Sequence, residues 1–124
     1  MSKAYENYIE EFKDFFDQYD AGLAGPGKIS STGGKFVRYM AECGKESFTR
    51  EILYNLKRKE ISMSNDENTG KPMAVNKADI IADASDEYKN YKQARNDYDS
   101  IKEMVASLAR LQKAAMGEMD MAGV

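Results

Sequence analysis

The longest stretch without a helix-breaking residue constrains this sequence most. Between Asn76 and Met116 the chain contains neither proline nor glycine, and the first glycine after this stretch is Gly117. Because proline and glycine are the residues that most often interrupt helices, a run of this length predicts one long helix over residues 76–117. Such a helix is several times longer than the average in globular proteins, so earlier helices, a second copy of the chain, or both must cover it.

Apolar residues recur along this stretch with the spacing of a coiled-coil seam. With Tyr91 at heptad position a, the register stays clean as far as Leu108 at position d. We therefore predict that the long helix carries contacts between copies and that the protein is a homo-oligomer. The predicted interface consists of Tyr91, Ala94, Tyr98, Ile101, Val105, Leu108 and Met119.

The rest of the chain divides into helices and polar connections. Residues 3–19 combine aromatic residues at helical spacing with acidic residues between them, which predicts an acidic amphipathic helix. Residues 20–34 are rich in glycine and predict a loop, and residues 62–75 form a second, polar loop. Between them, residues 35–60 predict a basic central helix or two helices in series. The fold class is thus all-α, a helical hairpin or small bundle built on the long C-terminal helix, in a single domain of residues 1–124.

The composition argues against several classes of function. The chain has no histidine, the commonest general base and zinc ligand, so we predict no catalytic residues, no metal site and no cofactor. A single cysteine, Cys43, excludes an intrachain disulfide and fits a reducing compartment. There is neither a membrane-spanning apolar run nor a signal peptide, so we expect no membrane contact and a cytoplasmic location, in the host cell if a phage encodes the chain.

The charges are unevenly distributed along the chain. Residues 28–59 carry eight basic and three acidic side chains, whereas the segments before and after them are both net acidic. A basic middle between acidic ends predicts either a face that binds a polyanion or a middle that packs against the ends.

The basic segment also contains aromatic residues. On a helical wheel, Phe48, Ile52, Leu53 and Leu56 form an apolar side, and a basic-aromatic side lies opposite with Lys59 near its edge. Cations pair with phosphates and aromatic rings stack on bases, so this pattern predicts contact with single-stranded DNA. The predicted nucleic-acid-binding residues are Lys35, Arg38, Lys45, Arg50, Tyr54, Lys57, Arg58 and Lys59. A solvated face, or one paired with the acidic flanks, explains the same pattern.

Several other patterns fall short of functional motifs. The stretch GLAGPGKI from Gly22 is one residue away from a phosphate-binding loop, but Ile29 replaces the hydroxyl that would ligate magnesium. The segment after Asp66 lacks the glycine and glutamate of a calcium loop. A cluster of four acidic residues at positions 79, 83, 86 and 87 is better explained by the helix dipole than by a metal. The tyrosines at positions 88, 91 and 98 are better explained by packing than by stacking on bases.

The order of helices resembles that of small helical phage proteins, and most of all UvsY-type recombination mediators. The stretches that carry the resemblance are ILYNLKRKE and EYKNYKQARNDYDSIKEMVASLARLQ, within a region from Lys35 onward. The resemblance implies a ring-forming protein that helps to load a RecA-like recombinase onto single-stranded DNA coated by a single-strand-binding protein. It also implies that the basic-aromatic stretch from Arg50 to Lys59 contacts DNA. The sequence departs from that family in its net acidic charge and in its glycine-rich first loop.

Three functional hypotheses follow. The first is a non-enzymatic accessory protein of recombination or replication that binds single-stranded DNA and partner proteins, such as a recombinase or a single-strand-binding protein. The second is an inhibitor or adaptor, for example an anti-defence protein, that docks on a host protein. The third is a helical assembly or scaffold factor.

Overall fold

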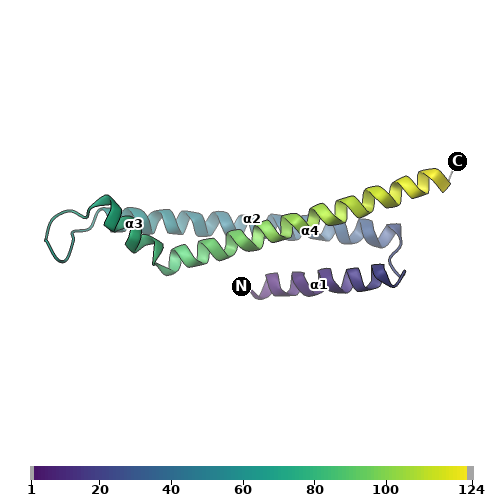
Figure 1. The fold of residues 1–124 in the computed structure, drawn as a ribbon, viewed down its shortest axis with the longest axis horizontal. Helices are drawn as coiled ribbons and strands as arrows, with labels where there is room; N and C mark the ends of the chain where they lie inside the picture. The colour runs from purple at the N-terminus through teal and green to yellow at the C-terminus, as the bar shows by residue number, and fades with distance from the viewer. Residues whose placement is uncertain (1, 123–124) are drawn as a thin grey trace. The chain divides into compact units, whose positions relative to one another are not determined.

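The computed structural model describes the backbone of residues 2–122 and the side chains of residues 2–117, and it confirms an all-α fold. The elements are α1 (Lys3–Asp20), α2 (Pro26–Ser62), α3 (Val75–Asp83) and α4 (Asp86–Ala122) (Figure 1). No strand occurs within the described backbone, where the one β contact is an isolated bridge between Asn65 and Pro72. None of the helices there is both long enough and apolar enough to span a bilayer.

Two element boundaries differ from the sequence-based prediction. The predicted loop over residues 20–34 is wrong in extent, because α2 already begins at Pro26. Proline suits the first position of a helix, where its missing N–H would have no helical partner. The true connection is short and turns at Gly22, whose φ of 76° favours glycine. The central segment is one helix, since α2 continues through residues 35–60.

The predicted helix over residues 76–117 is also wrong in one respect, because it is interrupted. It divides into α3 and α4, with Ala84 and Ser85 between them. The Ser85 hydroxyl accepts a hydrogen bond from the backbone N–H of Tyr88 (3.3 Å), and Asp86 and Glu87 occupy the first turn of α4. A serine cap followed by acidic residues is a favourable helix start, so this sequence begins a new helix without a proline or a glycine.

The contacts divide the chain into two compact units. Unit 1 comprises the described residues of Met1–Cys43 and Asp97–Val124, and unit 2 comprises Gly44–Asn96. Both units are helical, and α2 and α4 each contribute residues to both. The prediction of one domain stays a prediction.

Unit 1 consists of α1 and the adjoining parts of α2 and α4 (Figure 1). Its core contains three side chains with no appreciable exposure, Phe36 of α2 and Ile101 and Leu108 of α4. Aromatic residues of α1 pack against this core, with the Phe12 and Phe36 ring centroids 5.7 Å apart. The aromatic stripe predicted over residues 3–19 therefore faces inward, and α1 covers the apolar side of the C-terminal helix.

Unit 2 consists of the second part of α2, a connecting segment, α3 and the first part of α4. Its core is smaller and contains Tyr54, Ile61, Ala78 and Ala82 as buried members. The connecting segment is ordered around Asp66, which accepts hydrogen bonds from the backbone of Asn68 and from the Lys77 ammonium, both at 2.8 Å. The hydrogen bond from Lys77 is the main cause that lowers the pKa of the Asp66 carboxyl.

Candidate docking surface

The second part of α2 turns its predicted basic-aromatic side inward. Tyr54 is only 8% exposed, and its ring centroid lies 5.0 Å from that of Tyr88 and 5.7 Å from that of Tyr91. Its phenol donates a hydrogen bond to Asp83 of α3 at 2.5 Å. Burial, followed by this hydrogen bond, raises the pKa of Tyr54 to about 12. Burial leaves the Tyr54 ring little surface for stacking on a base: the small side chains of Ala78 and Ala82 leave room for the ring, and Asp83 accepts the hydrogen bond of its hydroxyl.

Four of the seven cations among the predicted DNA-binding residues have a carboxylate partner within the chain. Arg50 contacts Glu46 at 2.7 Å, and Arg58 contacts Asp79 of α3 at 3.5 Å. The other two pairs are Lys57 with Glu60 at 3.8 Å and, in unit 1, Lys35 with Glu11 at 3.5 Å. These pairs are consistent with the alternative that the basic segment packs against acidic residues, although partly exposed pairs of this kind are weak.

The three remaining cations are exposed and form no ion pair within the described part of the chain. They are Arg38, Lys45 and Lys59. Arg38 belongs to unit 1, whereas Lys45 and Lys59 both belong to unit 2. On the helix, Lys45 and Lys59 are fourteen residues apart and lie on nearly the same side, which is the side opposite Tyr54.

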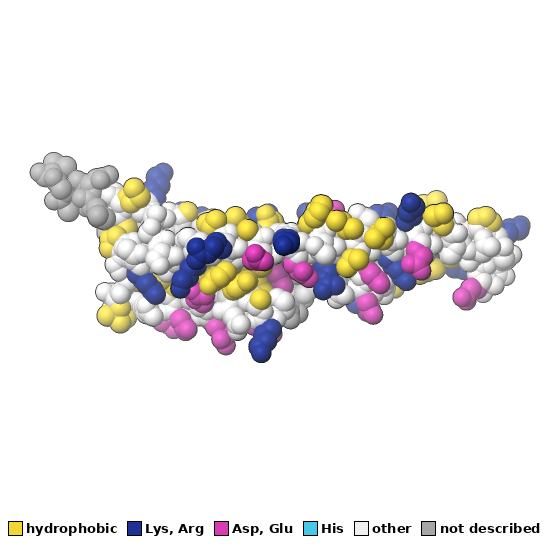
Figure 2. Space-filling model, turned by 180° about the vertical axis from the view of Figure 1, so that it is seen from behind, with side chains coloured by type: hydrophobic (Ala, Val, Ile, Leu, Met, Phe, Trp, Pro, Cys, Tyr) yellow, Lys and Arg dark blue, Asp and Glu magenta, His cyan; other side chains and the backbone are white. Residues whose placement is uncertain are grey.

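The apolar side of α2 is the exposed side in unit 2. Phe48, Ile52 and Leu56 follow one another at four-residue intervals and are 64%, 44% and 58% exposed. Leu53 flanks them and is also exposed. Figure 2 shows the molecule from behind, and there hydrophobic side chains lie among Lys, Arg, Asp and Glu side chains. We call the surface formed by Lys45, Phe48, Ile52, Leu53, Leu56 and Lys59 the outer face of α2.

The orientation of this helix places Phe48, Ile52 and Leu56 of the predicted apolar side on the surface. In unit 2, α3 and α4 cover one side of α2, and Tyr54 and Ile61 fill the contact. The sequence offered a signal for this orientation. Tyr54 and Arg58 lie four residues apart on α2, as Asp79 and Asp83 do on α3, and the two spacings match in the observed pairs.

The predicted oligomer seam lies largely inside the chain. Ile101 and Leu108 are fully buried in the core of unit 1, and Val105 packs against that core. Tyr91 packs in the core of unit 2, Ala94 is also buried, and Tyr98 is half-buried. Most of these six residues thus make contacts within the chain, and their predicted role between copies stays a prediction. Met119 lies outside the described side chains.

The other near-motifs adopt structural roles. Asp79 and Asp83 pair with α2, and no group of three or more His, Cys, Asp or Glu side chains with a metal-binding arrangement occurs among the described residues. Tyr88 and Tyr91 belong to the core of unit 2. Ile29 of the glycine-rich stretch is buried in unit 1, within α2.

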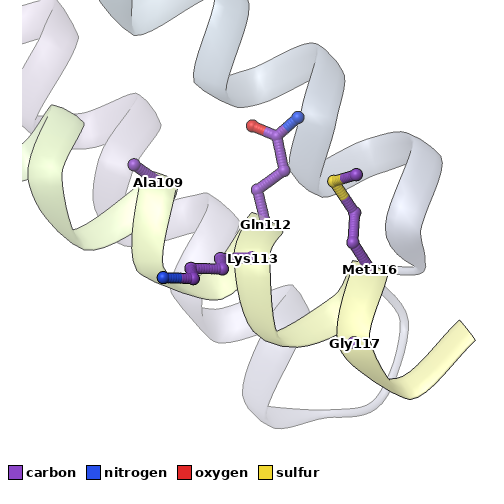
Figure 3. Close-up of a pocket in the computed structure, with 5 residues that line it drawn as sticks. All are labelled: Ala109, Gln112, Lys113, Met116 and Gly117. Atoms are coloured by element: carbon purple, nitrogen blue, oxygen red, sulfur yellow. The ribbon is translucent and has the colours of Figure 1, made fainter. Parts of the chain in front are cut away.

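An open groove runs along the last described turns of α4 in unit 1. It is lined by Ala109, Gln112, Lys113, Met116 and Gly117 (Figure 3). Gln112 extends toward α2 and donates a hydrogen bond to Ser30 at 3.3 Å. The lining of this groove is mainly apolar and contains one charged side chain, that of Lys113. The outer face of α2 has a lysine at each end.

Comparisons with protein-family models, with curated proteins and with solved structures find no match to this chain. The resemblance to UvsY-type mediators stays a hypothesis that rests on the sequence stretches that carry it.

Proposed function

We propose that this chain is a non-enzymatic binding protein that docks on another protein through the outer face of α2. The observation that carries the proposal is the row of Phe48, Ile52 and Leu56, which are large, apolar and exposed on consecutive turns. Single exposed apolar residues are ordinary, but a contiguous group between charged residues is typical of an interaction surface. This function corresponds to the inhibitor or adaptor hypothesis and requires no reacting group.

The charges of the chain also support a protein partner. Most cations of the predicted DNA-binding set already have a carboxylate within reach, so they offer phosphates less free charge than the sequence suggests. Buried Tyr54 cannot stack on a base without leaving its hydrogen bond to Asp83. An exposed apolar row with charges at its border has the composition of a protein interface core with a polar rim.

Site-specific photocrosslinking tests this function. A photoreactive amino acid replaces Ile52 in the outer face or, as a matched control, the exposed Leu23 of unit 1. In extracts of the source cells, we expect one discrete adduct from position 52 and none from position 23. The crosslinked protein, once purified, should bind the unmodified chain and lose that binding with the double variant Phe48→Ser, Ile52→Ser. Adducts from position 23 only, or binding that ignores the double variant, contradict the proposal.

A second candidate function is binding of single-stranded DNA, as the resemblance implies. The observation in its favour is that the unpaired Lys45 and Lys59 share an exposed face with the Phe48 ring. Cations with an exposed aromatic ring are the groups that a single strand requires. The partners on this hypothesis remain a recombinase or a single-strand-binding protein.

Fluorescence anisotropy with a labelled single strand at two salt concentrations tests this candidate. Binding that weakens strongly with salt, and weakens more in Lys45→Ala, Lys59→Ala than in Arg50→Ala, Arg58→Ala, supports it. The second pair is the matched control, because each of those arginines already contacts a carboxylate. Absence of binding at low salt contradicts the candidate.

A further inference from the structure

The outer face of α2 carries a lysine at each end, and neither lysine forms an ion pair within the described part of the chain. Lys45 and Lys59 lie at its two ends, each seven residues from Ile52 at its centre. The positions between them on the same side hold Phe48, Thr49, Asn55 and Leu56, so no carboxylate interrupts the face. Glu46 and Glu60 lie at the edge of this face, on either side of Leu53, and they contact Arg50 and Lys57, respectively.

This arrangement disfavours a second copy of the chain as the occupant. In an antiparallel contact between two such faces centred on Ile52, Lys45 of each copy approaches Lys59 of the other. In a parallel contact, each lysine approaches its own counterpart. Both arrangements place like charges together at both ends, which is unfavourable at an interface.

The dimensions of the face suit a helix. At about 1.5 Å per residue, the apolar row from Phe48 to Leu56 is about 12 Å long, and the two lysines are about 21 Å apart along the axis. The row at four-residue spacing forms a ridge of the kind that packs into the groove of a second helix. A partner helix of about four turns therefore covers the row and reaches both lysines.

We infer that the partner presents an amphipathic helix with an apolar stripe and acidic residues at both ends of that stripe. This inference rests on the proposed function and adds the chemistry of the partner to it. The apolar stripe supplies most of the contact, and the carboxylates select the partner by pairing with Lys45 and Lys59.

Two designed peptides test the inference against the full chain. Both are alanine-rich helices with the same leucine and isoleucine stripe, and they differ only in having glutamate or lysine at the ends of the stripe. We expect the glutamate peptide to bind about three- to tenfold more tightly in fluorescence anisotropy, since each exposed ion pair contributes modestly. The double variant Lys45→Glu, Lys59→Glu should reverse this preference.

The double variant Phe48→Ser, Ile52→Ser should weaken the glutamate peptide by about tenfold or more, because it removes the centre of the contact. All four positions are exposed, so circular dichroism should show unchanged helicity in both double variants. Equal binding of the two peptides overturns the acidic partner but leaves the docking face in place. Absence of binding by either peptide, or preferred binding to vesicles of phosphatidylcholine with phosphatidylserine, overturns the inferred helix. Crosslinking from position 52 then decides separately whether the face binds a protein.

Discussion

Unit 1 and unit 2 use their apolar residues differently. Unit 1 encloses large side chains such as Phe36, Ile101 and Leu108, and aromatic residues of α1 surround them. Half of the buried hydrophobic residues in the core of unit 2 are alanines. The large apolar residues of unit 2 are mostly exposed instead, namely Phe48, Ile52, Leu53, Leu56, Met63, Val75, Ile80 and Ile81. Large apolar side chains stabilise the fold of unit 1, whereas those of unit 2 are exposed and available for binding.

Isoleucine-to-alanine substitutions test this difference most strongly. Ile101→Ala should lower the free energy of unfolding by about 2 to 5 kcal/mol, because it leaves a cavity in the core of unit 1. The matched control Ile52→Ala, on the outer face of α2, should change it by only about 0.5 kcal/mol. Chemical denaturation followed by circular dichroism measures both. Equal losses from the two variants would mean that the outer face is packed in solution.

Alkaline pH should weaken unit 2 through Tyr54. The pKa of Tyr54 is raised from its ordinary value of 10.0 to about 12, so its contribution to stability is present below pH 10 and is lost as the pH rises to about 12. The loss amounts to about 2 to 3 kcal/mol, and Tyr54→Phe should remove this part of the pH dependence. Denaturation at a series of pH values measures it. A pH profile that is the same in Tyr54→Phe would show that Tyr54 is not the group responsible.

Tyrosine-to-phenylalanine substitutions compare a polar contact in each unit. In unit 1, Tyr39 donates a hydrogen bond to Glu11 at 2.7 Å, and this bond is the main cause that raises the pKa of Tyr39. Tyr39→Phe should cost about 1 kcal/mol at neutral pH, because the Tyr39 ring keeps its stacking on Tyr8 at 4.1 Å. Tyr54→Phe should cost at least as much, since Tyr54 is the more buried. The reverse order in denaturation experiments would contradict the assignment of Tyr54 to the core of unit 2.

The smallest expected effect is a gain in stability in unit 1. Gly34 lies within α2 without a positive φ, and a Cβ atom added there meets nothing within 4 Å. Gly34→Ala should therefore raise the free energy of unfolding by about 0.5 to 1 kcal/mol through helix propensity. Thermal unfolding of the variant and the natural chain measures this gain. A loss instead would indicate that this part of α2 requires the freedom of glycine.

The sequence predicted the class of fold because its periodicity is strong. Helical spacing of aromatic residues located α1 closely, and the absence of breakers located the C-terminal helical region. The break at Ser85 was not predicted, because no proline or glycine occurs there. It depends on the serine side chain, which caps a new helix where the sequence would also allow the first helix to continue. The early start of α2 was not predicted, because glycines at positions 27, 33 and 34 suggested a loop. Burial of Ile29 and Thr32 keeps the segment helical.

The candidate site was less predictable than the fold. The second part of α2 has apolar residues on both sides, Tyr54 and Ile61 on one and Phe48, Ile52 and Leu56 on the other. On the helical wheel the second group forms the apolar side, and Tyr54 lies among arginines and lysines, which is typical of a surface. The choice depends on α3, whose carboxylates and alanines accept Tyr54, and such pairing is not visible within the segment itself.

Methyl-resolved NMR of the full chain with the glutamate-bordered peptide tests the role of the outer face most directly. Isoleucine and leucine methyl groups occur both on that face, at Ile52, Leu53 and Leu56, and in the core of unit 1, at Ile101 and Leu108. We predict that the peptide shifts the methyl signals of Ile52, Leu53 and Leu56 and leaves those of Ile101 and Leu108 in place. Shifts confined to Leu111, which packs against the core of unit 1, or no shifts at all, would contradict the assignment of the outer face of α2 as the docking surface.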